Sequence, residues 1–126
     1  MKMGILSILA TMLFSALLFC SGAQANEPPN MPYVFEANCF LCHREPEQTG
    51  PSSIFDMRSK TGNPLHEQYI RNNVRFGISA MPAFRISEVS PKALDDIVNY
   101  LKTVAAYRKE HPDYKPMPGP EEGIEK

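Results

Sequence analysis

The stretch "NCFLCHRE" at residues 38–45 constrains the fold of this chain more than any other. It places Cys39 and Cys42 three positions apart, with His43 directly after the second cysteine. Three kinds of site use such a pattern, namely a zinc site, a redox-active dithiol and a covalent haem attachment. Each kind needs different partners elsewhere in the chain, so the rest of the sequence decides among them.

The first residues indicate export. Lys2 is followed by an apolar run from Met3 to Cys20 and then by the small-residue stretch Ala23-Gln24-Ala25, which is the layout of a secretory signal peptide. The run is also long enough for a marginal membrane anchor, but the Ala-x-Ala site favours cleavage. We therefore predict a signal peptide at residues 1–25, cleaved after Ala25, and a periplasmic protein without a membrane segment.

The remaining 101 of the 126 residues suffice for one small domain. Removal of residues 1–25 takes away one cation and leaves a formal charge of −2, which does not suggest nucleic acid as a partner. Both remaining cysteines belong to the one motif, so a disulfide framework is excluded. We predict a domain at residues 26–110 and, because residues 111–126 are rich in proline and lack an apolar period, a flexible tail.

Three helices are predicted, and no segment alternates with period two for long. The first begins near residues 30–32 and is closed by Pro46. The second has Asn63 as its N-cap and Pro64 at its first position, and it stops at Gly77.

The third helix has the clearest signal, with Ser90 as its cap and Pro91 at its first position. Its apolar residues form one continuous stripe: Leu94, Ile97, Val98, Leu101, Val104 and Ala105. The sequence thus predicts a small all-α domain with long loops at 44–62 and 77–89. Loops of that length in so small a domain suggest that a buried prosthetic group replaces part of the core.

Haem attachment is the interpretation of the motif that its surroundings favour. A zinc site needs four ligands, and the only other histidines, His66 and His111, are neither paired nor spaced as a second half-site. A thioredoxin-like dithiol uses a β-α-β scaffold that this pattern lacks. In a haem site, the thiols of Cys39 and Cys42 reach the two vinyl groups of one porphyrin, and His43 presents its imidazole to the iron.

The second iron ligand is predicted to be Met81, in "GISAMPAF" at residues 77–84. A thioether is a soft ligand that favours ferrous iron and raises the reduction potential, and Pro82 stiffens the loop. A methionine in an apolar loop is also a common core filler. His66 and His111 therefore stay as alternative ligands.

The sequence also offers candidate partners for the iron-binding histidine and for the haem propionates. A ligating imidazole needs an acceptor for its free N–H, and the turn at residues 49–53 can bring the carbonyl of Pro51 there. Buried haem propionates need cationic or hydrogen-bonding partners, although each candidate could equally belong to an ordinary solvated surface. The candidates are Arg58, Arg71, Arg75, Tyr69 and Asn72.

These residues resemble the class I cytochromes c over nearly the whole packed interval, through Phe35 four residues before Cys39 and the stretches "CFLCH", "TGP", "AMP" and "DDIVNYLK". The resemblance implies that the first and last helices cross at an aromatic contact. That contact is expected between Phe35 and the residues Ile97, Tyr100 and Leu101.

A closer similarity runs through "YIRNNVRFGISAMPAF" and "LDDIVNYL". These stretches are similar to the small cytochrome c subunits of the 4-cresol dehydrogenase flavocytochromes, in which a flavoprotein oxidises an alkylphenol and passes electrons singly to the haem. The similarity implies one haem c attached to Cys39 and Cys42, with His43 and Met81 on the iron. It also implies a flavoprotein dehydrogenase as redox partner.

With both axial positions filled, we expect an electron-transfer protein and not an enzyme. One alternative keeps this role and changes the partner. That partner is another dehydrogenase, such as a quinoprotein dehydrogenase, or a sulfur-oxidising complex, or a terminal oxidase. The other alternative is a ligand-binding haem enzyme or sensor in which Met81 detaches from the iron.

Overall fold

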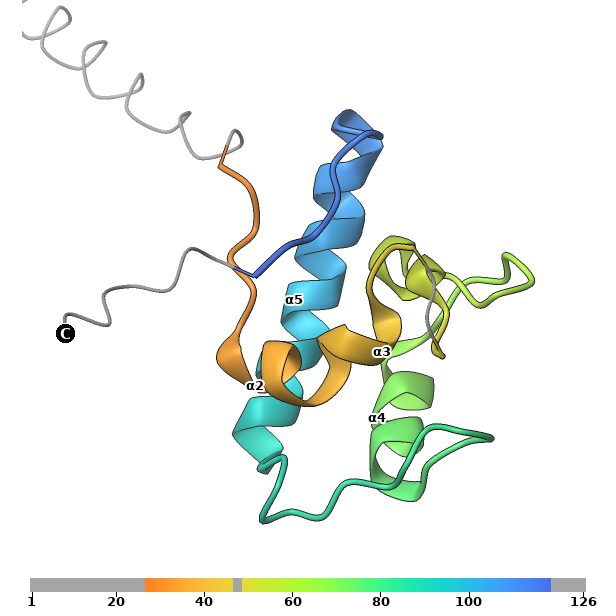
Figure 1. Ribbon diagram of the computed structural model, residues 1–126, viewed down its shortest axis with the longest axis vertical. Coiled ribbons are helices and arrows are strands. Elements are labelled where there is room, and N and C mark those ends of the chain that lie inside the picture. The colour runs from red at the N-terminus through yellow and green to blue at the C-terminus, as the bar shows by residue number, and fades with distance from the viewer. Residues whose placement is uncertain (1–26, 47–48, 119–126) are drawn as a thin grey trace, which may run out of the picture.

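The structure is a computed structural model that describes residues 27–46 and 49–118. Helices are the regular elements of this part of the chain, which has two isolated β-bridges and no strand, so the predicted all-α fold is confirmed. In Figure 1 the long helix α5 (Pro91–Glu110) runs through the middle, with the first helical run crossing it and α4 (Glu67–Phe76) beside it. The predicted signal peptide lies outside the described residues.

The first helical run carries the cysteine motif. It consists of α2 (Tyr33–Phe35), a π-helical turn η2 (Glu36–Phe40) and α3 (Leu41–His43), which follow one another without a break. Arg44 is already extended, so the run ends before Pro46, as expected for a proline that closes a helix. The π-turn contains Cys39, and such turns are frequent at functional sites.

Helix α5 begins as the sequence predicts. Ser90 accepts a hydrogen bond from the Ala93 N–H at 3.1 Å, and Pro91 takes the first helical position. Every member of the predicted stripe is buried except Ala105, which is half-buried. The helix therefore lies with one face against the rest of the domain.

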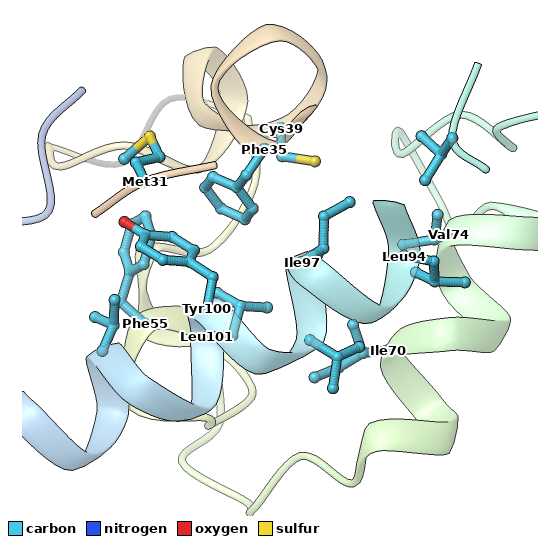
Figure 2. Close-up of a cluster of buried hydrophobic side chains, with 13 residues drawn as sticks. Met31, Phe35, Cys39, Phe55, Ile70, Val74, Leu94, Ile97, Tyr100 and Leu101 are labelled. Carbon is cyan, nitrogen blue, oxygen red and sulfur yellow. The ribbon is translucent and has the colours of Figure 1, made fainter. Parts of the chain in front are cut away.

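The core forms where the first helical run crosses α5. The Phe35 ring lies 5.1 Å from the Tyr100 ring and 5.8 Å from the Phe55 ring, measured between centroids, and Figure 2 shows it pointing toward α5. This is the aromatic contact that the resemblance implies. Apolar residues from the first helical run, α4, α5 and the segments before them complete the cluster: Met31, Cys39, Ile70, Val74, Val89, Leu94, Ile97, Val98, Leu101 and Val104.

The loop at 44–62 contains a short 3-10 helix, η3 (Ser52–Asp56). Phe55 is fully buried and inserts this helix into the core. An aromatic side chain buries a large apolar area, so one residue is enough to hold such a short element. The loop is thus attached to the domain next to the cysteine motif.

Helix α4 starts later than the sequence predicts. Asn63 and Pro64 were expected to open it, but the helix begins at Glu67. Both residues instead belong to a turn, because the Ser59 N–H donates to the Asn63 carbonyl at 2.8 Å and Pro64 forms an isolated β-bridge with Arg58. The hydrogen bonds of this turn outweigh the local preference of Pro64 for a first helical position.

The described part of the predicted tail, residues 111–118, folds back toward the N-terminal lead-in (Figure 1). The Tyr114 ring meets the Tyr107 ring edge-on at 4.9 Å, and its hydroxyl donates to the Pro29 carbonyl at 3.4 Å. Pro116 is buried. The domain boundary after residue 110 stays a prediction.

Candidate functional site

The two cysteines differ in their surroundings although they share one helical run. Cys39 is buried and Cys42 is exposed, and both are free thiols. Burial, and to a smaller extent the neighbouring Cys42, raises the pKa of the Cys39 thiol to about 12. A redox-active dithiol needs a lowered thiol pKa, so this environment argues against that interpretation.

His43 ends α3 and is held by the loop that follows. Its Nδ1 lies 3.1 Å from the carbonyl oxygen of Pro51, which confirms the predicted contact. Because a carbonyl can only accept a hydrogen bond, Nδ1 carries the proton. The other ring nitrogen, Nε2, is therefore free to bind a metal.

Gly50 explains how the loop comes so close to the imidazole. Its N–H donates to the Cys42 carbonyl at 2.9 Å, and a Cβ at this position would lie 2.6 Å from Nδ1 and 2.8 Å from Nε2 of His43. Such distances are too short for any side chain. This steric role of Gly50 was not predicted from the sequence. The Gly-Pro pair soon after the motif was the feature that could have indicated it.

The predicted methionine ligand lies on a tight turn. The N–H of Ile78 donates to the Met81 carbonyl at 3.1 Å, and the N–H of Met81 donates to the Ile78 carbonyl at 2.9 Å. Gly77, which ends α4 as predicted, has a φ of +71°, and a Cβ there would lie 2.8 Å from the Met81 carbonyl oxygen. Met81 itself is half-buried against the core.

The Met81 turn is tied to α4 at its far end as well. The Phe84 N–H donates to the Val74 carbonyl at 2.8 Å, and Arg75 Nη1 donates to the Phe84 carbonyl at 3.3 Å. Arg75 was a candidate for a haem propionate, but here it holds the loop. The backbone around Met81 is consequently fixed from two sides.

Two other predicted propionate partners bind within the protein. Arg71 pairs with Asp95 at 2.6 Å, and Arg58 donates to the Gly62 carbonyl at 2.9 Å. These contacts connect α4 with α5 and close the loop before α4. Tyr69 is exposed on α4.

The alternative ligands are placed differently from Met81. His66 is exposed at the start of α4. His111 follows the end of α5, where its Nδ1 donates to the Tyr107 carbonyl at 3.1 Å and its ring stacks on the Tyr107 ring at 4.0 Å.

The donor set fits a haem better than a zinc ion. No group of three or more His, Cys, Asp or Glu side chains gathers within the described ranges in a way that could hold a metal ion. Two thiols on one helical run, next to an imidazole with a free Nε2, instead suit a porphyrin that supplies the remaining iron ligands itself. Gly50 leaves the imidazole uncovered on the side where a Cβ would lie.

Comparison with known proteins identifies the family. Residues 26–101 match the family model described as cytochrome c oxidase, cbb3-type, subunit III. The chain is 33% identical over 94 residues to the 4-cresol dehydrogenase (hydroxylating) cytochrome c subunit of Pseudomonas putida, covering 74% of this chain and 77% of that protein. No solved structure has significant similarity to it. The family match covers more than half of the sequence and includes the whole motif, so the chain belongs to the cytochrome c family, whose members bind haem and transfer electrons.

Proposed function

We propose that this protein is a periplasmic c-type cytochrome with one haem that transfers single electrons and catalyses no reaction of its own. Cys39 and Cys42 attach the haem through thioether bonds, and His43 and Met81 are the iron ligands. The export signal at residues 1–25 belongs to the same proposal. No helix in the described part of the chain is long and apolar enough to cross a membrane.

The observation that carries this proposal is the environment of His43. Its Nδ1 is held by the Pro51 carbonyl at 3.1 Å, and Gly50 permits this approach because it has no side chain. A hydrogen bond of this kind fixes the orientation and tautomer of a ligating imidazole and raises its basicity. An ordinary surface histidine needs none of these arrangements.

A haem held by these residues stores and releases one electron at its iron. His43 and Met81 would both bind the iron, and with two protein ligands the metal would have no place for a substrate. The thioether of Met81 favours the ferrous state and raises the reduction potential. The hydrogen bonds at both ends of its turn fix the backbone that would present this sulfur to the iron.

The redox partner is proposed to be a flavin-dependent dehydrogenase of the alkylphenol-oxidising type, with this chain as its haem subunit or acceptor. The name of the Pseudomonas putida relative supports a dehydrogenase as partner. We place the docking face near Cys42 and residues 80–84, where the side chains of Cys42 and Ala80 are exposed. Co-purification with a yellow flavoprotein, or a neighbouring gene for an FAD-binding phenol oxidase, supports this partner. A stable complex with a quinoprotein instead contradicts it.

Covalent attachment is tested on the protein purified after export. We expect a coloured protein that begins at Asn26 and keeps its haem in acidified acetone. Replacing Cys39 and Cys42 together by alanine abolishes this retention, because no thioether bond can form. A colourless wild-type protein, or haem that acidified acetone removes, contradicts the proposal.

The sulfur ligand is tested by Met81→Ala. We expect loss of the weak far-red sulfur-to-iron absorption of the ferric protein and a fall in reduction potential on the order of 100 mV, since axial ligands tune this potential strongly. Met117→Ala is the matched control, because Met117 is exposed in the tail. If the far-red band survives in Met81→Ala, another residue binds the iron.

A further inference from the structure

Arg108 joins the end of α5 to two other segments. Its Nη1 lies 2.9 Å from Oε1 of Glu45, and its Nε lies 2.8 Å from Oδ1 of Asp56. The Arg108 side chain is only 14% exposed. One guanidinium thus pairs with two carboxylates that belong to different parts of the same loop.

This arrangement is stronger than a surface ion pair. Charge-assisted hydrogen bonds gain strength where water is largely excluded, and a planar guanidinium can hold two acceptors in a fixed geometry. The pair of Lys102 and Glu67, at 2.6 Å, is about half exposed on both sides and is therefore screened by water. Removal of Arg108 leaves two partly buried carboxylates without their cation, which is costly.

Along the chain the two carboxylates flank Pro51, whose carbonyl accepts from the imidazole. Glu45 comes two residues after His43, and Asp56 is the last residue of η3, which begins directly after Pro51. The stretch between the two anchors therefore contains the carbonyl that accepts from His43. Any shift of η3 moves this carbonyl relative to the ring.

We propose that Arg108 is a positioning residue that keeps the Pro51 carbonyl in contact with the His43 ring. It acts through the two carboxylates, which are its hydrogen-bond partners, and not through a bond to the ring. The inference rests on the proposed function, in which His43 is an iron ligand. A carbonyl that is held firmly against the free N–H of a ligating imidazole orients the ring, and one that is loosely held does not.

Two kinds of contact hold η3: hydrophobic packing in the core and the ion pair with Arg108. Phe55 anchors this helix in the core, where its ring lies 5.8 Å from the Phe35 ring. Its neighbours Ile54 and Met57 also pack, partly buried, against this core. Hydrophobic contacts are non-directional, and the bond from Arg108 to Asp56 adds a directional attachment at the last residue of η3.

The experiment measures exchange of the His43 Nδ1 proton with solvent, by NMR of the haem-bearing protein. In Arg108→Met we expect exchange about tenfold faster than in the wild type, the fold-change that loss of one hydrogen bond produces. The backbone N–H of Leu101, buried in α5, is the internal reference, because global unfolding accelerates both protons alike. Arg108→Lys is expected to restore the slow exchange only in part, since an ammonium cannot hold both carboxylates in one geometry.

Lys102→Met is the matched control. It also removes a cation from α5 and breaks an ion pair, here with Glu67, but it does not touch the loop that holds His43. We expect unchanged exchange of the Nδ1 proton relative to Leu101. An equal acceleration in Lys102→Met and Arg108→Met shows that Arg108 is merely a structural brace and overturns the proposal.

A second variant decides the matter if Arg108→Met does not fold. Asp56→Asn keeps an oxygen that accepts from Arg108 and removes the charge, so we expect a smaller acceleration in the same direction. Unchanged exchange in this variant and in Arg108→Lys overturns the role of Arg108 and leaves the proposed function intact. A wild-type protein without covalent haem overturns both.

Discussion

Gly50 shapes the surroundings of His43 through the side chain that it lacks. A Cβ at this position would come within 2.8 Å of Nε2 and nearer still to Nδ1 and Cε1 of the ring. The imidazole cannot turn away easily, because the Pro51 carbonyl holds its Nδ1. A single methyl group therefore forces either the loop or the ring out of place.

Gly50→Ala is expected to lower the yield of haem-bearing protein and to destabilise what forms by about 1–3 kcal/mol, the usual cost of overpacking. Haem content per protein and the thermal midpoint measure the two effects. Gly62→Ala is the control: its φ of +85° also disfavours alanine, but a Cβ there meets nothing within 4 Å. We expect Gly62→Ala to cost stability alone, and equal haem content in both variants would contradict the role of Gly50.

Tyr100 is a buried residue whose hydroxyl has no hydrogen-bond partner among the described residues. Burial, and to a smaller extent Tyr114, raises the pKa of this phenol above its ordinary value of 10.0. The unfolded chain therefore loses the proton at lower pH than the folded protein does. It follows that the free energy of unfolding falls as the pH rises above about 10.

Tyr100→Phe is expected to stabilise the protein by about 1 kcal/mol, because it removes an unsatisfied buried polar group and keeps the ring. It also reduces the loss of stability above pH 10, which urea unfolding at a series of pH values measures. Tyr33→Phe is the control, since Tyr33 is 82% exposed. A destabilised Tyr100→Phe would show that the hydroxyl has a partner after all.

At the scale of the elements, the turn that carries Met81 depends on two residues with positive φ. Gly77 has φ +71° and Ser79 has φ +51°. Glycine adopts this region without strain, whereas a side chain with a Cβ does not. The turn is thus built with glycine at one of the two positions and serine at the other.

Gly77→Ala is expected to loosen the turn, since the added Cβ lies 2.8 Å from the Met81 carbonyl oxygen. The backbone of Gly77, with φ 71° and ψ 166°, also lies in a region that is essentially limited to glycine, where a side chain costs about 1–3 kcal/mol. The temperature at which the far-red band disappears measures the effect, and we expect it to fall. Ser79→Gly relieves strain at an exposed position and should raise that temperature. The same response in both variants would show that backbone conformation does not control the ligand.

The elements also show what the sequence can and cannot reveal. The start of α5 is determined by neighbouring residues, because Ser90 caps the helix and Pro91 takes its first position. It was therefore predicted correctly from the sequence. The predicted start of α4 was wrong, because backbone hydrogen bonds to the preceding segment keep Pro64 in a turn and out of the helix. The bond from Arg108 to Glu45 joins residues 63 positions apart, and no sequence period marks such a pair.

At the scale of the whole molecule, large apolar side chains remain on the surface of α4 and the turn after it. Tyr69 is 47% exposed, Phe76 80% and Ile78 45%. In a domain this small, the protein core alone provides limited stability, and a bound prosthetic group often supplies the remainder.

Loss of the haem is therefore expected to unfold much of the domain. The double variant Cys39→Ala, Cys42→Ala should lose a large part of its helical far-ultraviolet dichroism and melt at a clearly lower temperature, because a ligand that binds only the folded state stabilises it. Lys92→Ala is the control, since it breaks an exposed ion pair with Asp96 at the surface of α5. An unchanged thermal midpoint in the double variant would show that the protein core suffices.

The hydrogen bond between Tyr114 and Pro29 brings the two ends of the described chain together, as Figure 1 shows. Ends that lie close are suited to circular permutation, in which a short linker joins them and new termini are opened elsewhere. The turn at residues 59–63, which is exposed and far along the chain from both His43 and Met81, offers a place for the new termini. An electrode tether or a fused dehydrogenase attached near Pro29 or near Tyr114 would approach the domain from one and the same side.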